Sequence, residues 1–224
     1  MNEIKAKVAE VFKSIQGEGL YQGASQVFVR FFDCNLECNF CDTKLENYEE
    51  FTILELLYKI KTYNKYHSIS LTGGEPLLQI EFLKGFLPVL KKHKKNIYLE
   101  SNGTLPQNLK QIIDWVDVVA MDFKLPSSTA LKDFWAKHRE FLRIANNKDV
   151  FVKAVIGNAT RVEDVRIGIA VIKEIRKDIP FILQPQHPFE DELGEKLQYF
   201  EKVCKESGMN VEIIPQLHKK LGIK

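Results

Sequence analysis

The sequence predicts an α/β protein built as a partial, open (βα)6-type barrel. Apolar runs of strand length alternate with longer stretches of helical periodicity. Strands separated by helices pair in parallel through crossover connections. Only six to seven such units fit into 224 residues, fewer than the eight of a closed barrel. No repeat or Pro/Gly/Ser-rich linker interrupts the chain, so we expect a single domain over residues 1–224.

The expected elements follow one another along the whole chain. The strands cover residues 8–12, 27–32, 68–72, 97–100, 116–121, 150–156, 181–184 and 211–214. Helical periodicity occupies residues 53–63, 80–92, 108–114, 162–176 and 192–207. Thr52-x-x-Glu55 and Thr160-x-x-Glu163 are typical capping boxes, which begin two of these helices. Because the carboxyl ends of parallel strands carry the site in such folds, we expect functional side chains just after each strand.

The composition narrows the class of protein. Hydrophobic residues make up 45% of the chain and charged residues 28%, as in ordinary globular proteins. The formal net charge of +2 gives no strong electrostatic basis for a nucleic-acid or membrane partner. No apolar run approaches the roughly 20 residues that span a bilayer, and the first residues lack the apolar segment of a secretory signal. We therefore expect a cytoplasmic, reducing setting.

Three cysteines within eight residues, Cys34-Asn-Leu-Glu-Cys38-Asn-Phe-Cys41, form the most informative segment. A tetrahedral metal or a cubane cluster normally takes four ligands. A 4Fe–4S cluster held by this loop alone would keep one iron open for the amino and carboxylate groups of S-adenosylmethionine. The same thiols also fit a zinc ion with a distant fourth ligand, or disulfides. Cys204 lies alone in a helical pattern and fits a small buried hydrophobe.

Polar segments follow two of the expected strands. In Thr72-Gly73-Gly74-Glu75-Pro76, the glycines allow a ligand close to the backbone and Glu75 offers an acceptor for a cationic group. The same segment also fits a tight strand-to-helix turn with Pro76 at the helix start. The stretch Glu100-Ser101-Asn102-Gly103-Thr104 is equally polar, although its Asn-Gly pair is typical of a turn.

Asp122, Lys124 and Gln184 end two later strands. Their positions fit ligand contacts, but charged groups of this kind are commonly just exposed. Thr43, two residues after the last cysteine of the loop, fits either a Mg²⁺ ligand or a capping hydroxyl.

The segment Ser14-Ile15-Gln16-Gly17-Glu18-Gly19 is denser in polar and flexible residues than a turn requires. Its glycines allow the backbone to wrap a planar ligand, and Gln16 and Glu18 suit the amide and amine edge of a pterin or guanine. Arg30 stands inside an apolar strand and must find an anion. That anion is either a substrate carboxylate, which matches the planar guanidinium, or an internal acidic side chain.

Together these motifs resemble the radical S-adenosylmethionine superfamily. The three-cysteine loop, with Phe40 before its last cysteine, and the Gly-Gly-Glu-Pro stretch carry that similarity. More discriminating stretches resemble the 7-carboxy-7-deazaguanine synthase family of the queuosine (7-deazapurine) pathway. These are Ile15-Gln16-Gly17-Glu18-Gly19, Cys41-Asp42-Thr43, Lys124-Leu125-Pro126-Ser127-Ser128 and Gln216-Leu217-His218.

The resemblance implies a carbon–nitrogen lyase that converts 6-carboxy-5,6,7,8-tetrahydropterin to 7-carboxy-7-deazaguanine and releases ammonia. It implies a 4Fe–4S cluster, S-adenosylmethionine and Mg²⁺ as cofactors, with a 5′-deoxyadenosyl radical that takes a hydrogen from C6 of the pterin. An electron donor such as flavodoxin or ferredoxin and a homodimeric assembly are also implied, and neither a nucleic acid nor a membrane is an expected partner.

The resemblance also assigns roles residue by residue. The ligands of the 4Fe–4S cluster, which initiates the radical, are Cys34, Cys38 and Cys41. The cofactor contacts are Phe40, Cys41, Asp42, Gly74, Glu75, Ser101, Asp122, Phe123, Lys124 and Gln184. The substrate contacts are Ile15, Gln16, Gly17, Glu18, Arg30, Thr72 and His218, with Thr43 holding Mg²⁺. Asp122-Phe123-Lys124 stands where Ser-Pro-Lys is commoner among members of the family. The sequence leaves open whether Lys153 or His187 contacts the substrate.

Two other functions remain as alternatives from sequence alone. A glycyl-radical enzyme activase also uses a three-cysteine loop, but its protein substrate requires no pterin-shaped pocket. A non-catalytic, zinc-stabilised binding protein would use the cysteines but leaves Arg30 and the glycine pair unexplained.

Overall fold

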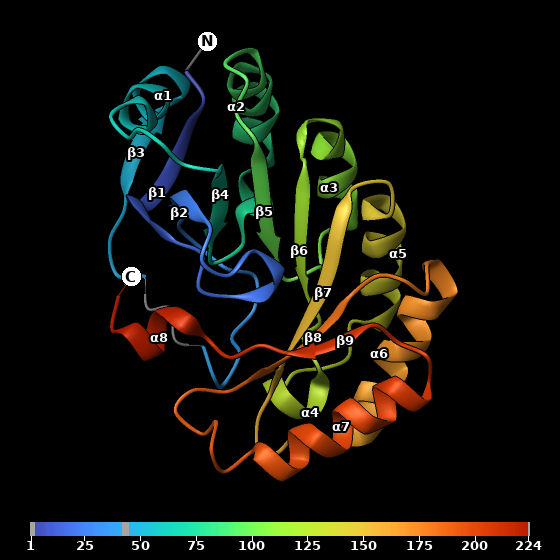
Figure 1. Ribbon diagram of the computed structural model, residues 1–224. Helices are drawn as coiled ribbons and strands as arrows, with labels where there is room; N and C mark the ends of the chain where they lie inside the picture. The colour runs from blue at the N-terminus through green and yellow to red at the C-terminus, as the bar shows by residue number, and fades with distance from the viewer. Residues whose placement is uncertain (1–2, 42–44, 224) are drawn as a thin grey trace.

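The computed structural model describes residues 3–41 and 45–223. Across these residues one nine-stranded sheet runs in the order β3-β1-β2-β4-β5-β6-β7-β8-β9 (Figure 1). The strands are β1 (Lys5–Ile15), β2 (Ser25–Phe31), β3 (Glu49–Thr52), β4 (Ser68–Gly73), β5 (Ile97–Ser101), β6 (Val118–Asp122), β7 (Asp149–Ile156), β8 (Phe181–Pro185) and β9 (Val211–Ile213). All neighbours from β2 to β9 pair in parallel, whereas β1 pairs antiparallel with both β2 and β3.

Helices form the crossovers between the parallel strands. They are α1 (Ile53–Lys61), α2 (Ile80–Lys92), α3 (Pro106–Ile112), α4 (Pro126–Thr129), α5 (Trp135–Ala145), α6 (Val162–Ile175) and α7 (Gly194–Glu206), and α8 (Leu217–Leu221) follows β9. Short 3-10 turns occupy Gly19–Tyr21, Pro76–Gln79 and Ile113–Trp115. Within the described ranges β3 and β9 are the two outer strands of the sheet, so the barrel is open, and the predicted partial (βα)6-type barrel is confirmed.

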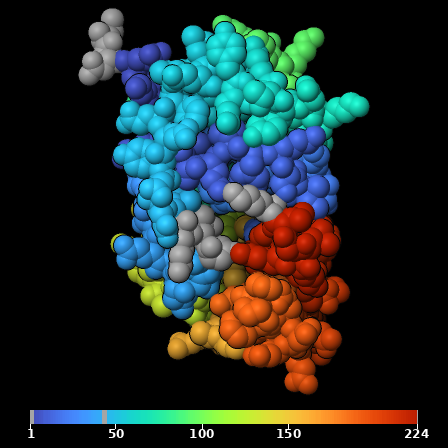
Figure 2. Space-filling view, turned by 90° about the vertical axis from the view of Figure 1, so that its left-hand side faces the viewer, coloured from blue at the N-terminus to red at the C-terminus, as the bar shows by residue number. Residues whose placement is uncertain are grey.

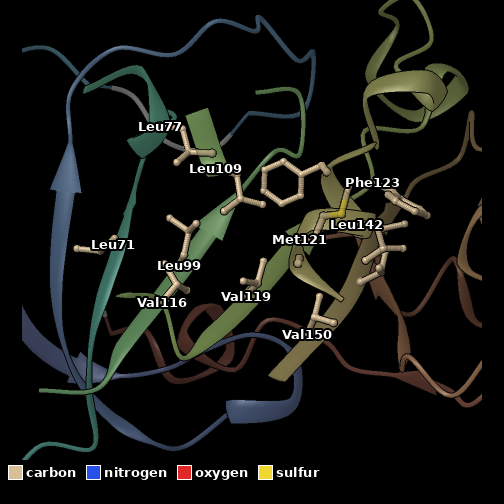
Figure 3. Packing of buried hydrophobic residues seen from close by; sticks show 14 of the residues in the cluster. Leu71, Leu77, Leu99, Leu109, Val116, Val119, Met121, Phe123, Leu142 and Val150 are labelled. Atoms are coloured by element: carbon tan, nitrogen blue, oxygen red, sulfur yellow. The ribbon is translucent and has the colours of Figure 1, made fainter. Parts of the chain in front are cut away.

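The main core lies between the sheet and the helices outside it. Leu71, Leu99 and Val119 from β4, β5 and β6 are fully buried. Figure 3 shows them in the same packed cluster as Leu109 of α3 and Leu142 of α5. Burial of each such side chain stabilises the folded state by about 1.5–3 kcal/mol relative to leaving it in water. Alternation along the strands turns the other residues inward, where Tyr98, Val118, Ala120, Phe151 and Ile182 form a second, smaller cluster. The apolar runs therefore encode a sheet that is buried on both faces.

Only one of the two predicted capping boxes is present in the structure. The capping box at Thr52 is confirmed, since Thr52 Oγ1 accepts a hydrogen bond from Glu55 N and Glu55 Oε2 accepts one from Thr52 N. The capping box at Thr160 is wrong. Helix α6 begins one residue later than that box requires, with Arg161 at its N-cap, and Thr160 Oγ1 instead accepts a hydrogen bond from Gly157 N at 2.8 Å.

One strand and three helices were not predicted: the edge strand β3 and the helices α4, α5 and α8. Helix α5 buries His138, Phe141, Leu142 and Ala145 at helical spacing. In the described part of the chain, no helix is both long enough and apolar enough to cross a membrane.

Candidate functional site

A cavity of about 1040 Å³ opens on the inner face of the sheet. Its walls come from the carboxyl ends of the parallel strands, the cysteine loop, the segment after β1 and the C-terminal segment. Figure 2 shows the C-terminal residues, in red, on the same face of the molecule as the light-blue stretch after β2. Side chains that are far apart in the sequence therefore meet around one space.

The cysteine loop supplies three thiols to this cavity. Cys34, Cys38 and Cys41 all line it, with Cys34 and Cys41 exposed and Cys38 half-buried. All four cysteines are free, so the disulfide alternative is wrong, and Cys204 is buried as predicted. Within residues 3–41 and 45–223, no three His, Cys, Asp or Glu side chains are close enough together to hold a metal ion. The three thiols thus share one loop and line one cavity.

Two glycines at the end of β4 bring this loop against the sheet. A Cβ on Gly74 would lie 2.0 Å from Asp33 O and 2.9 Å from Cys34 Cβ, and Glu75 N donates to Asp33 O at 2.9 Å. A Cβ on Gly73 would lie 2.1 Å from Phe31 O. We expected a ligand close to the backbone of these glycines. In the structure the chain from Phe31 to Cys34 lies there, at a distance that leaves no room for a Cβ.

Glu75 lies beneath the cavity wall and is fully buried. Its carboxylate accepts hydrogen bonds from Leu77 N, Ser101 Oγ and Asn102 N. Burial raises the pKa of Glu75 to about 7, although the hydrogen bonds act in the opposite direction. The structure thus places Glu75 as a link between the ends of β4 and β5, and this differs from the expected contact with a cationic ligand.

Phe123 is another predicted cofactor contact that the structure places in the core. Its side chain is 1% exposed and stacks on His138 with ring centroids 5.0 Å apart. Asp42 and Thr43, also predicted site residues, lie outside the described residues.

Two acidic and two basic side chains form a charged row along the cavity wall. Asp122 Oδ2 lies 3.0 Å from Lys124 Nζ and 3.6 Å from Lys153 Nζ. Lys153 also pairs with Glu18, which Gln216 Nε2 contacts at 2.6 Å. Burial alone would raise the pKa of Glu18 and lower that of Lys153. Their attraction reverses both effects, lowering the pKa of Glu18 to about 2 and raising that of Lys153.

Lys124 connects this charged row to the cysteine loop, because its ammonium lies 5.5 Å from the centre of the Phe40 ring. Two buried acceptors in the same wall, Asp122 Oδ1 and Gln184 Oε1, have no hydrogen-bond partner in the described structure. Asp122 is 8% exposed and Gln184 is 2% exposed. Since buried acceptors are almost always paired, these two atoms suit the hydroxyl or amino donors of a bound ligand.

The opposite half of the cavity combines aromatic rings with a guanidinium. Phe12 and Phe28 stack with centroids 5.1 Å apart, and the Arg30 guanidinium lies 5.6 Å from the centre of the Phe12 ring. Arg30 Nε pairs with Glu10 Oε2 at 3.3 Å, which is the internal acidic partner that the sequence left open. Arg30 nevertheless lies in the cavity wall, so its charge faces any ligand there.

A polar network forms the floor of this half. Glu100 accepts hydrogen bonds from Gln16 Nε2, Ser70 Oγ and Thr72 Oγ1, at 2.9–3.0 Å. Gln16 Nε2 also donates to Gln26 Oε1, and Gln16 Oε1 accepts from Glu18 N. The amide of Gln16 is thus already engaged, and this places Gln16 as a support for Glu18 and Glu100.

The C-terminal segment closes over the loop that follows β1. Leu217 N donates to Gly17 O at 2.8 Å, and a Cβ on Gly17 would lie 2.0 Å from Nδ1 of His218. Glycine at position 17 therefore allows His218 to reach the cavity. Ile15 and Gly17 also line it, as do Lys153 and His187.

Comparison with known proteins agrees with this geometry. Residues 29–178 match the family model described as the Radical SAM superfamily. The chain is 36% identical to the 7-carboxy-7-deazaguanine synthase of Geobacter sulfurreducens, covering 99% of each chain. It is 32% identical to the protein of the same name from Methanothermobacter thermautotrophicus, again covering 99% of each. The chain belongs to the 7-carboxy-7-deazaguanine synthase family of the radical SAM superfamily.

Solved structures show the same fold at lower identity. The crystal structure of QueE from Escherichia coli matches with a TM-score of 0.64 and 19% identity, covering 93% of each chain. Streptococcus suis SuiB bound to S-adenosylmethionine matches with a TM-score of 0.57 and 16% identity, covering 81% of this chain and 48% of SuiB.

Members of the radical SAM superfamily use a 4Fe–4S cluster and S-adenosylmethionine, and the residues of this chain fit both. Three free thiols on one loop are the soft donors that iron–sulfur clusters take. The unpartnered oxygens of Asp122 and Gln184 offer acceptors beside them. Most of the predicted site residues meet in one cavity, with Glu75 and Phe123 placed behind its wall.

Sequence reasoning missed Phe12 and Phe28 of the cavity wall, and it named the stretch from Glu100 to Thr104 without giving a role to Glu100 or Asn102. A carboxylate at position 100, two residues beyond the inward-facing Tyr98 in a strand, was a usable signal. Inward-facing positions alternate, so Glu100 had to face the interior of the barrel.

Proposed function

We propose that this chain is a 7-carboxy-7-deazaguanine synthase that acts on 6-carboxy-5,6,7,8-tetrahydropterin and releases ammonia. The observation that carries the proposal is a single cavity with two chemically different halves. One half holds three thiols and two unpartnered acceptors, and the other holds an arginine beside stacked aromatic rings. Identity over nearly the full length of the named synthases supports the same activity.

Cys34, Cys38 and Cys41 are the proposed cluster ligands. When bound, the reduced cluster and S-adenosylmethionine supply the 5′-deoxyadenosyl radical that takes a hydrogen atom from the substrate. Asp122 and Gln184 are the proposed acceptors for the hydroxyl and amino groups of S-adenosylmethionine. Phe40, Lys124, Gly74 and Ser101 complete this half, with Lys124 holding Asp122 in place by its ion pair.

The pterin fits the other half of the cavity. A flat bicyclic ring gains from stacking against Phe12 or Phe28, and the carboxylate at C6 gives Arg30 a second anion besides Glu10. Glu18, Thr72 and His218 line the same cavity and offer hydrogen bonds to the amide and amine edge of the ring. In this proposal Ile15 and Gly17 supply backbone contacts, and Gln16 orients Glu18.

The remaining parts of the proposal rest on family resemblance and exposure. Thr43 is the proposed Mg²⁺ ligand. Cys34 and Cys41 are exposed, so an external donor such as flavodoxin or ferredoxin can approach the cluster. A homodimer is proposed because Ile4, just before β1, and Leu54 and Tyr58 of α1 are apolar side chains that are each more than half exposed. A cytoplasmic location would keep the three thiols reduced.

The proposed function is tested by direct assay without oxygen. Reconstituted protein is incubated with S-adenosylmethionine, dithionite and the carboxypterin, and the products are identified by mass spectrometry. We expect 7-carboxy-7-deazaguanine from the wild type and none from Cys38→Ala, while Cys204→Ala, a buried cysteine outside the loop, retains activity. Absence of deazapurine from a wild-type protein with a full cluster would overturn the assignment.

Family membership does not support the two alternative functions. The glycyl-radical activase alternative predicts radical transfer to a protein, and the zinc alternative predicts a colourless protein with zinc. The reconstituted protein distinguishes both alternatives from the synthase, because its metal content and its small-molecule product are measured on the same sample.

A further inference from the structure

A closed ring of three side-chain hydrogen bonds joins the cysteine loop to the loop after β5. Asn35 Nδ2 donates to Thr104 Oγ1 at 2.8 Å, and Thr104 Oγ1 donates to Asn102 Oδ1 at 2.6 Å. Asn102 Nδ2 completes the ring by donating to Asn35 Oδ1 at 2.9 Å. Every member donates and accepts within the ring, so the three bonds strengthen one another. We call these three residues the Asn35 clamp.

The clamp rests on a rigid base. Asn102 is 6% exposed and Thr104 is 1% exposed. The backbone of Asn102 is held from two sides, since its N–H donates to Glu75 Oε2 at 2.8 Å and its carbonyl lies 3.2 Å from His138 Nε2. Burial lowers the pKa of His138 to about 4, so the neutral ring donates this bond through Nε2. The two clamp residues after β5 are therefore fixed before any ligand binds.

Cys34 lies between two anchored neighbours. Before it, Asp33 O accepts the hydrogen bond from Glu75 N, and after it, Asn35 is held by the clamp. The other end of the loop is tied by backbone bonds, Asn39 N to Thr129 O at 3.4 Å and Cys41 N to Cys38 O at 3.1 Å. Cys34 thus occupies the more firmly held end of the loop.

We propose that Asn35, Asn102 and Thr104 are positioning residues that hold Cys34 as the fixed ligand around which the 4Fe–4S cluster assembles. This rests on the proposed assignment of the three thiols as cluster ligands. Cluster binding must order three thiols of one loop at the same time. A ligand that is already in place lowers the cost of that ordering. The clamp touches no thiol, so it acts through the backbone next to Cys34.

The lifetime of the cluster tests the clamp directly. Protein reconstituted without oxygen is mixed with an iron chelator, and loss of the visible iron–sulfur absorption is followed with time. Partners outside the ligand shell commonly change metal affinity by 10-fold or more, so we expect Asn35→Ala and Thr104→Val to lose the cluster about 10-fold faster. The double variant should lose it no faster than the faster single variant, because both changes break the same ring.

Two matched controls accompany these variants. Thr104→Ser keeps the hydroxyl and should restore a lifetime within about twofold of the wild type. Asn39→Ala changes the same residue type in the same loop, outside the clamp, and should also stay within about twofold. The electron paramagnetic resonance spectrum of the reduced cluster should change in Asn35→Ala and remain that of the wild type in Asn39→Ala.

The outcomes separate this inference from the proposed function, since no product is measured. A wild-type lifetime and spectrum in Asn35→Ala would overturn the clamp alone, and so would an equal loss in Asn39→Ala. A wild-type protein that takes up no cluster would overturn both the thiol assignment and the clamp.

Discussion

Glu18 and Lys153 form an ion pair across 135 residues of sequence. Glu18 follows β1 and Lys153 lies within β7, so the pair joins two segments of the cavity wall that are far apart in the sequence. Gln216 of the C-terminal segment holds the other oxygen of Glu18, at 2.6 Å. One carboxylate therefore links three parts of the cavity wall. Glu18 and Lys153 are both mostly buried, and the charge of each offsets the cost of removing the other from water.

The first prediction concerns the stability of Lys153→Met. Removing the ammonium leaves Glu18 buried without its cation, so we expect the free energy of unfolding at pH 7 to fall by about 3–5 kcal/mol. The folded pKa of Glu18, about 2, lies below the ordinary 4.5, so its stabilisation is present above pH 4.5 and is lost as the pH falls toward 2. The difference between variant and wild type should therefore shrink over this window.

Urea unfolding at pH 7, 4.5 and 2.5 measures this difference. Lys205→Met is the matched control, because its ion pair with Glu201 is at the surface and should contribute under about 0.5 kcal/mol. A difference that stays constant from pH 7 to 2.5 would mean that the ion pair is not its source.

The second prediction concerns two buried groups whose pH effects oppose each other. The folded pKa of His138, about 4, lies below the ordinary 6.5, so its contribution to stability is lost as the pH falls from 6.5 to 4. The folded pKa of Glu75, about 7, lies above the ordinary 4.5, so its contribution is lost as the pH rises from 4.5 to 7. The two effects partly cancel in the wild type.

Single variants should separate these effects. In Glu75→Gln, the free energy of unfolding should rise more steeply between pH 4.5 and 6.5 than in the wild type. In His138→Gln, it should fall over the same interval. Denaturant titrations of metal-free protein at half-unit pH intervals measure both slopes, and identical slopes in all three proteins would contradict the prediction.

Features that depend on residues close together in the chain could be predicted from the sequence. Contacts that depend on how distant strands align with one another could not. Spacing alone places Cys34, Cys38 and Cys41 on one loop, and the capping box at Thr52 needs only the residue three positions later. The engagement of Gln16 with Glu100 depends on how β1 and β5 meet across the barrel. No local pattern contains that information.

Helix α5 shows a second limit. Its buried face contains His138, a polar residue in the middle of an otherwise apolar stripe, so the helical period is weak in the sequence. The imidazole is accepted there because it bonds to Asn102 O and stacks on Phe123. Tertiary contacts thus decide both the helix and the placement of Phe123 behind the cavity wall.

The third prediction concerns Asp122→Asn and the binding of S-adenosylmethionine. The substitution removes the charge between Lys124 and Lys153 and turns one acceptor into a donor. We expect affinity for S-adenosylmethionine to fall about 10-fold, or about 1.4 kcal/mol. Calorimetry of cluster-loaded protein without oxygen measures it. Asp178→Asn, which alters an exposed ion pair with Arg176, should bind as the wild type does. Equal affinity in Asp122→Asn would remove Asp122 from the proposed cofactor contacts.

The fourth prediction concerns Arg30→Lys and the carboxylate of the pterin. Lysine keeps the positive charge but lacks the planar fork and the delocalised cation that lies over Phe12. We expect kcat/KM for the carboxypterin to fall about 100-fold, which corresponds to about 2.7 kcal/mol. Most of the loss should appear in KM, because Arg30 contacts the carboxylate equally in the bound substrate and the transition state.

Two further variants sharpen the fourth prediction. Arg139→Lys, at an exposed pair with Glu174, should leave both constants unchanged. Glu10→Gln keeps an acceptor for Arg30 Nε but removes the competing negative charge. If Arg30 binds the carboxylate, this variant should have an equal or lower KM, because the substrate then faces less repulsion near Arg30. A higher KM in Glu10→Gln together with an unchanged KM in Arg30→Lys would show that the carboxylate binds elsewhere in the cavity.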